Sequence, residues 1–217
     1  MFIGLAIIAL FLQTIFAKKF KEKQKMSELY VNATRFTGEE VVRSIFQSKG
    51  ITSIKLTEGK KEQNHYNPQS DTVVLAPEVY RDNSVADVAI AAHEASHSLQ
   101  DSFFDFIRPF RIFFVLSAML AFVLSIPTGI IGFLFGSYFT LLFAHWSIVY
   151  CLGVFSFFSF LNLFTEADAS LKALKFLKDL QLISIKERKQ ARHVLTLAYG
   201  TYVFSFLFTA CLLLHFF

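Results

Sequence analysis

Two histidines four residues apart, with a glutamate beside the first, form the segment His93-Glu94-Ala95-Ser96-His97. On an α-helix, residues four apart lie on one face, so both imidazoles can reach one zinc ion about 2 Å away. Glu94 points to one side of that face, where it can take a proton from a water molecule rather than bind the metal. The spacing therefore predicts a Zn²⁺ site with His93 and His97 as ligands and Glu94 as the catalytic base.

A later acidic segment supplies the candidate for the remaining ligand. A catalytic zinc site usually takes three protein ligands, and Glu166 begins the segment Glu166-Ala167-Asp168-Ala169-Ser170. The chain between His97 and Glu166 is mostly apolar, and a hairpin of two packed helices would bring its two ends to within about 8–10 Å. We expect Glu166 to be the third ligand; it could also be a membrane-boundary charge. Asp168 is the alternative ligand, or it could orient an imidazole through the ring N–H.

Other residues are weaker candidates for a role at this site. His65 could contact substrate or polarise its carbonyl, although a histidine in a polar turn is more often only solvated. His193 is interpreted as an interfacial residue, and His145 and His215 as span or terminal residues. An extended peptide can add to the edge of a sheet through main-chain hydrogen bonds, and the predicted strand Thr72–Leu75 is the candidate to receive it.

The zinc motif is expected to lie on a helix. Ser84 with Asp87 three residues later resembles a capping box, and the alanine-rich stretch Val85–Leu99 favours a helix. Before it, the chain is expected to form a short amphipathic helix that ends at Gly50, a strand at Ile51–Leu56, a turn at Asn64–Pro68 and a strand at Thr72–Leu75.

The distribution of charge indicates a membrane protein. The 217 residues are 54% hydrophobic and only 18% charged, below the roughly 25% of soluble domains. Uncharged stretches run through Met1–Ala17, Ile112–Thr165 and His193–Phe217. Because a span needs about 20 apolar residues, the last stretch is expected to cross once and the middle stretch twice, with a turn near Gly136-Ser137-Tyr138. The first stretch is short for a span and could be a signal peptide, but its lysines follow the apolar run instead of preceding it.

The basic residues predict the orientation. All 21 Lys and Arg lie in the two charged windows between these spans, and by the positive-inside rule that side faces the cytoplasm. We interpret the net charge of +4 as a feature that orients the protein in the membrane and attracts it to anionic lipid headgroups. It does not indicate a nucleic-acid partner, because no recognisable binding module is present. Cys151 and Cys211 lie inside predicted spans, so neither a disulfide framework nor a cysteine zinc site is expected.

Four segments of the chain together resemble the YugP-type bacterial neutral zinc metallopeptidases, and the resemblance covers almost the whole chain. The segments are Thr37–Arg43, His65–Pro68, Val88–Gln100 and Glu166–Ser170. The resemblance implies a gluzincin-like site, with His93, His97 and Glu166 on zinc and Glu94 as base. The chain departs from the family pattern at Asn67, Ser96 and Ala167, where Asp, Gly and an aromatic residue are usual.

The expected fold is a mainly α membrane protein, with about four transmembrane helices and a small cytoplasmic α+β zincin-like domain. We divide the chain into five parts. They are an N-terminal transmembrane anchor at 1–17, a cytoplasmic zincin-like domain at 18–111, a transmembrane hairpin at 112–164, a cytoplasmic helix with the third ligand at 165–192, and a C-terminal transmembrane helix at 193–217.

The expected function is that of a membrane-bound zinc metallopeptidase, which hydrolyses peptide bonds of peptides or proteins, membrane proteins among them, near the cytoplasmic membrane surface. The expected location is the cell membrane, with several spans and the catalytic domain facing the cytoplasm. The alternatives are a catalytically silent zinc-binding scaffold or adaptor, and a zinc hydrolase or metal-transport component that acts on something other than a peptide. An intact Glu94 favours the enzyme, because a structural zinc site needs no base. The sequence does not specify an oligomeric state.

Overall fold

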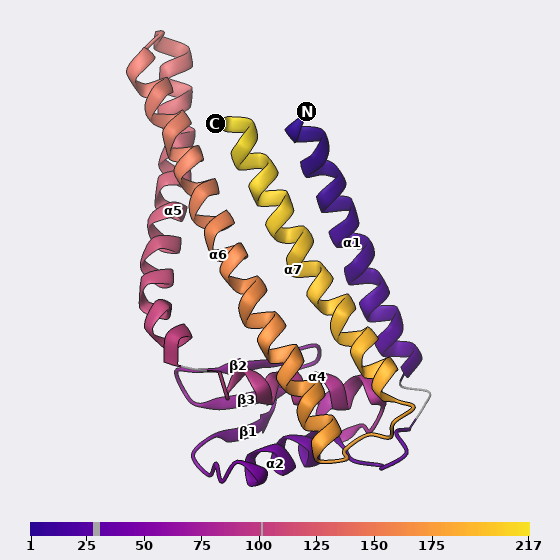
Figure 1. Ribbon diagram of the computed structural model, residues 1–217. Helices are drawn as coiled ribbons and strands as arrows, with labels where there is room; N and C mark the ends of the chain where they lie inside the picture. The colour runs from indigo at the N-terminus through magenta and orange to yellow at the C-terminus, as the bar shows by residue number, and fades with distance from the viewer. Residues whose placement is uncertain (28–30, 101) are drawn as a thin grey trace. The chain divides into compact units, whose positions relative to one another are not determined.

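The computed structural model describes residues 1–27, 31–100 and 102–217, and it is mostly helical (Figure 1). The chain divides into two compact units. The first unit consists of Met1–Thr14, Asp101–Phe164 and Thr201–Phe217, and the second consists of Ile15–Gln100 and Thr165–Gly200. Three long helices contribute a segment to each unit, so each unit is described by itself.

Long apolar helices make up the first unit. The four helices concerned are α1 (Phe2–Ser27), α5 (Ser102–Phe135), α6 (Tyr138–Asp179) and α7 (Arg188–Phe216). Each is long and apolar enough to cross a membrane, and the prediction of four spans is confirmed to that extent. The predicted hairpin turn is also confirmed, because α5 and α6 are separated only by Gly136 and Ser137. Gly136 has a φ of 65°, a backbone conformation that glycine adopts without strain.

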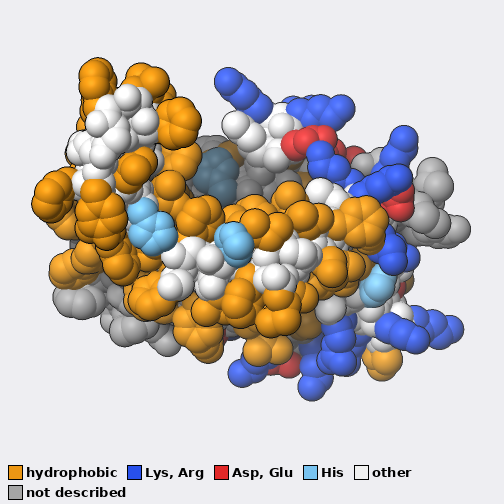
Figure 2. Space-filling view, turned by 90° about the horizontal axis from the view of Figure 1, so that it is seen from above, with side chains coloured by type: hydrophobic (Ala, Val, Ile, Leu, Met, Phe, Trp, Pro, Cys, Tyr) orange, Lys and Arg blue, Asp and Glu red, His pale blue; other side chains and the backbone are white. Residues whose placement is uncertain are grey.

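The surface of these helices is apolar. Hydrophobic side chains cover most of the helical surface seen in Figure 2, and Phe133 and Phe139 are 83% and 82% exposed. Contiguous apolar surface on this scale is not tolerated in water and marks a membrane-facing region. A helix satisfies its own backbone groups, so such segments can lie in the hydrocarbon of a bilayer.

A three-stranded sheet lies in the second unit. Its strands are β1 (Lys55–Glu58), β2 (His65–Asn67) and β3 (Thr72–Leu75), in the order β1-β3-β2. β3 pairs parallel with β1 and antiparallel with β2. The strand prediction for Thr72–Leu75 is confirmed, whereas the first strand begins later than predicted. The prediction of a simple turn at Asn64–Pro68 is wrong, because pairing with β3 extends this polar segment.

Two capped helices flank the sheet residues in the chain. α2 (Gly38–Ser48) begins with a capping box, in which the Thr37 side chain accepts from the Glu40 backbone N–H and the Glu40 carboxylate accepts from the Thr37 N–H. α4 (Val85–His97) follows the short α3 (Pro77–Arg81). Its N-cap is Ser84, whose hydroxyl accepts from the Asp87 N–H, as the sequence predicts. These caps satisfy backbone donors that the first helical turn leaves unpaired.

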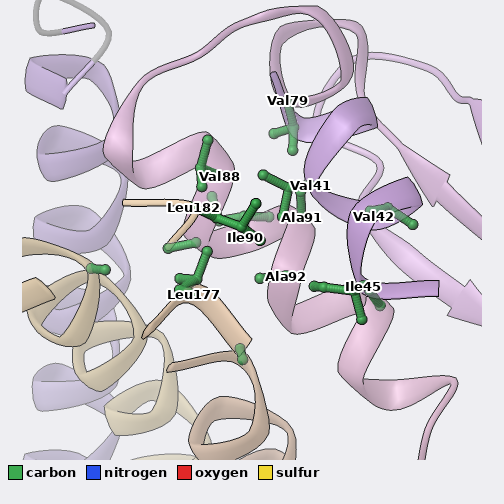
Figure 3. Close-up of a cluster of buried hydrophobic side chains, with 14 of the residues drawn as sticks. Val41, Val42, Ile45, Val79, Val88, Ile90, Ala91, Ala92, Leu177 and Leu182 are labelled. Atoms are coloured by element: carbon green, nitrogen blue, oxygen red, sulfur yellow. The ribbon is translucent and has the colours of Figure 1, made fainter. Parts of the chain in front are cut away.

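The core of the second unit is built around α4 (Figure 3). Val41 and Ile45 of α2 are fully buried with Ala91 and Ala92 of α4, and Leu177 of α6 belongs to the same cluster. Alanines leave little side-chain volume on α4, so neighbouring helices can approach its backbone closely. Gly38, at the start of α2, shows how close this packing is: a Cβ there would lie 2.0 Å from the Val79 carbonyl oxygen and 3.2 Å from Ala91 Cβ.

Replacing Gly38 with alanine should therefore destabilise the protein by about 1–3 kcal/mol, the usual cost of overpacking a core. The clash is with backbone atoms, which a rotamer change cannot relieve. Thermal unfolding of the detergent-purified protein measures the effect, and we expect a lower melting temperature for Gly38→Ala. Gly4→Ala is the matched control, because a Cβ at Gly4 meets nothing within 4 Å. Equal melting temperatures for the two variants would contradict this account of the core.

Candidate metal centre

The last turn of α4 presents the two histidines of the motif on one side of the helix. The His93 and His97 rings lie 4.6 Å apart between centroids and are nearly perpendicular, at 87°. The buried alanines on the opposite side of the helix hold α4 in the core, so the orientation of the imidazoles is determined by packing. The side chains of His93 and His97 are 12% and 18% exposed. Both histidines are thus accessible but largely enclosed.

α6 brings Glu166 to these histidines within the second unit. His93 Nε2 lies 3.2 Å from Glu166 Oε2, and His97 Nε2 lies 3.7 Å from the same oxygen. The two Nε2 atoms are 3.1 Å apart. The expectation that His97 and Glu166 lie close together is confirmed, since all three candidate ligand atoms fall within 4.8 Å of one another.

This arrangement fits a zinc ion. Zinc bonds to imidazole nitrogen and carboxylate oxygen are about 2.0–2.1 Å long, so neighbouring ligands of a tetrahedral ion lie roughly 3.3 Å apart. The three observed separations scatter around that value. Two nitrogens and one oxygen are also the kind of donor set that zinc accepts in catalytic sites. Within the described part of the chain, no other group of three His, Cys, Asp or Glu side chains is gathered in this way.

The outer nitrogens of both rings have partners that orient them. Ser170 Oγ lies 3.2 Å from His93 Nδ1, and Gln100 Oε1 lies 3.1 Å from His97 Nδ1. A carbonyl oxygen only accepts hydrogen bonds, so the neutral His97 ring carries its proton on Nδ1. Its Nε2 lone pair is then directed to the cluster, as a metal ligand requires.

Gln100 also joins the end of α4 to the segment of α6 that carries Glu166. Its amide nitrogen donates to the Thr165 carbonyl oxygen at 2.6 Å and to Asp168 Oδ2 at 3.2 Å. Asp168 in turn forms an ion pair of 2.8 Å with Lys172. The structure therefore places Asp168 next to Gln100 and Lys172, and it reaches His97 only through Gln100. Sequence reasoning missed Gln100, although its position three residues after His97 was a usable signal.

Glu94 lies beside the cluster with an altered affinity for protons. Burial raises the pKa of Glu94, and the neighbouring His93 and His97 oppose that rise. His65 also lowers the pKa of Glu94 through its charge, so this histidine of β2 lies within electrostatic reach of the site. A carboxylate with a raised pKa is a stronger base than an exposed one, which suits proton transfer near neutral pH.

The cluster favours positive charge at its centre. Burial acts to lower the pKa of His97, but the hydrogen bond to Glu166 and the charge of Glu94 raise it to about 9. In the absence of a cation, His97 therefore holds an extra proton at neutral pH. A metal ion supplies the same positive charge to the carboxylates, so the electrostatics of the cluster are compatible with metal binding.

The arrangement of the sheet corrects one expectation about substrate. Thr72–Leu75 forms β3, the central strand, and both of its edges are already paired with β1 and β2. The prediction that this strand receives a peptide is therefore wrong. β2 is an edge strand, and it carries His65. Sequence analysis missed β2 because it is short and lies between Asn64 and Pro68, residue types that are typical of turns.

The remaining histidines and cysteines stay outside the cluster. His145 and His215 belong to the first unit, and His193 is exposed near the start of α7. Cys151 and Cys211 are free thiols. None of these residues is part of the described group that could hold a metal.

Comparisons with known proteins agree with this donor set. The profile of a family described as "Putative neutral zinc metallopeptidase" matches residues 1–217. The "Putative membrane protease YugP" of Bacillus subtilis (strain 168) is 29% identical over 222 residues, covering 100% of this chain and 95% of that protein. No solved structure matches the chain. From the match across its whole length, the chain belongs to the neutral zinc metallopeptidase family that this profile describes.

Proposed function

We propose that this protein is a membrane-bound, zinc-dependent peptidase, in which His93, His97 and Glu166 hold the metal and Glu94 is the general base. One observation carries the proposal: two imidazole Nε2 atoms and one carboxylate oxygen converge within 4.8 Å, directly beside a carboxylate with a raised pKa. The family to which the chain belongs supports zinc as the metal and a peptide bond as the target.

The mechanism follows from the roles of these side chains. When bound, zinc polarises the scissile carbonyl and makes a water molecule more acidic. Glu94 accepts a proton from the attacking water and then returns it to the nitrogen of the leaving amine. Gln100 and Ser170 hold the imidazoles so that both Nε2 atoms point to the same position. His65, on the exposed edge strand β2, is in reach to contact the substrate.

The site is proposed to work at the cytoplasmic surface of the cell membrane. The positive-inside rule supports this orientation, because all 21 Lys and Arg lie in the windows that adjoin the candidate spans on one side. Glu166 begins the first charged stretch after the uncharged part of α6. Substrates are then peptides or proteins near that surface, membrane proteins among them.

A catalytically silent zinc scaffold is the rival function. The position of Glu94 argues against it, since a partly buried carboxylate that binds no metal is costly and a structural zinc site needs no base. A transport component is less well supported, because ion pathways use charged or His side chains within spans. The uncharged stretches contain only His145 near such a position.

Glu94→Gln should abolish peptide hydrolysis while leaving the bound zinc in place. Glutamine keeps the size of the side chain but cannot accept the proton, and removal of a general base costs about 10²–10⁴-fold in rate. Casein cleavage and metal analysis of the detergent-purified parent and variant measure both properties. Hydrolysis at the parental rate by Glu94→Gln would refute the role of the base. If both proteins bind about one zinc and neither cleaves casein, a scaffold or a narrower substrate becomes the better explanation.

Glu166→Ala should lose bound zinc, whereas Asp168→Asn should retain it. Glu166 offers the oxygen that faces both Nε2 atoms, while Asp168 faces Gln100 and Lys172. The two residues are two positions apart on α6. A general disturbance of this helix would therefore lower the zinc content of both variants, whereas loss of a ligand would lower it only in Glu166→Ala. Zinc content of the purified proteins is the measurement. Loss of zinc in Asp168→Asn with retention in Glu166→Ala would reverse the assignment of the third ligand.

Gln100→Ala should weaken zinc binding by about 10–100-fold, the usual effect of removing a group that orients a metal-bound imidazole. The variant removes the acceptor for His97 Nδ1 and both bonds from Gln100 to α6. Competition with a chelator of known zinc affinity measures the change. Ser98→Ala is the control, because among the described residues the Ser98 hydroxyl bonds only to the Ala95 carbonyl oxygen of the preceding turn. Equal zinc affinities for the two variants would show that Gln100 does not position His97.

A further inference from the structure

A groove of about 660 Å³ lies in the second unit between the last part of α6 and the first part of α7. Leucines form part of its lining, with Leu195 of α7 almost fully buried and Leu171 of α6 68% exposed. Leu174, one turn further along α6, also lines it. The groove therefore offers an apolar surface that the rest of the unit does not cover.

Basic side chains surround this apolar surface. Lys175, Lys178 and Arg192 line the groove and are exposed. Among the residues that the structure describes, none of these three has an ion-pair partner, in contrast with Lys172, which is paired with Asp168. Asp179 is the one carboxylate in the lining. We call Lys175, Lys178 and Arg192 the rim of the groove. The rim carries an excess of positive charge that the protein itself does not neutralise.

The helices that form the groove are continuous with candidate membrane spans. α7 is a single helix in which Arg192 is the last charged residue before the uncharged run to Phe217. α6 is likewise continuous, and its uncharged run ends at Thr165, shortly before the groove residues. The groove therefore lies on two helices whose uncharged runs are candidate spans, and phospholipid headgroups are the most concentrated ligand at the ends of such spans.

We propose that this groove binds one anionic phospholipid. The lipid phosphate lies among Lys175, Lys178 and Arg192, and the glycerol and first acyl carbons rest on the leucines. Cationic pockets at the ends of transmembrane helices recognise anionic headgroups by the same combination of charge and apolar contact. Ser170 lines the groove and contacts His93 of the metal cluster, so a peptide on its way to the cluster could also lie here. Because the basic side chains would attract an acidic peptide, that peptide is the competing occupant. Lipid binding here does not depend on peptidase activity.

The test compares two triple variants of the full chain in a neutral detergent. Lys175→Gln/Lys178→Gln/Arg192→Gln removes the rim. The control, Lys55→Gln/Lys186→Gln/Lys189→Gln, makes the same change in charge at exposed lysines outside the groove lining. Native mass spectrometry gives the affinity of each protein for dioleoyl phosphatidylglycerol and for dioleoyl phosphatidylcholine. Melting temperatures establish that the variants are folded. If the rim triple variant does not fold, Lys178→Gln and Arg192→Gln are measured singly.

The parent and the control should bind phosphatidylglycerol more tightly than phosphatidylcholine. The rim variant should lose on the order of 100-fold of that preference at low salt, or about 5-fold for each single change. Equal losses in both triple variants would mean attraction to the whole surface and would overturn the proposal. An unchanged preference in the rim variant would overturn it too. Binding of hexaglutamate is measured for the same proteins. If the rim variant loses the hexaglutamate binding of the parent but keeps its lipid preference, the groove is a peptide site instead.

Discussion

The meeting of α4 with Glu166 is the interaction on which the candidate site depends. α4 presents two imidazoles, those of His93 and His97, on one face. A third protein ligand for the metal therefore has to come from elsewhere in the chain. Glu166 comes from α6, and α5 together with the uncharged part of α6 separates it from α4 in the chain. The separations of 3.2 and 3.7 Å from its carboxylate to the two imidazoles therefore require the second unit to hold both helices in register.

Packing and polar contacts share that task. The alanines of α4 and the missing side chain of Gly38 let the neighbouring helices approach within van der Waals contact. Ser170 of α6 then lies within hydrogen-bonding distance of the His93 ring, whereas Gln100 follows His97 by three residues and reaches its ring locally. Gln100 has the larger role, since it bonds His97 and also the Thr165 carbonyl oxygen of the helix that carries Glu166. Loss of packing in the core would therefore weaken these hydrogen bonds and shift the candidate ligands relative to one another.

The surfaces of the two units suit different surroundings. The first unit is apolar, and the candidate site lies in the second, more polar unit. Exposed phenylalanines suit hydrocarbon, whereas the second unit has a capped, ion-paired surface suited to water and headgroups. Glu94 is enclosed enough for its pKa to rise, while His65 remains exposed on an edge strand that can meet an incoming chain. The basic groove between α6 and α7 adds a point at which the lipid itself can be recognised.

By itself, the sequence determined the local features of this protein. Helical spacing put His93, Glu94 and His97 together, the Ser84 cap marked the start of the zinc helix, and the segregation of charge marked four spans and the turn near Gly136. Only the tertiary structure decided the pairing of β2 with β3, the occupied edges of Thr72–Leu75 and the place of Asp168 beside Gln100. Periodicity and capping act within a few residues of the chain. Strand order and the partners of a ring nitrogen depend instead on contacts between distant segments, which no local pattern records.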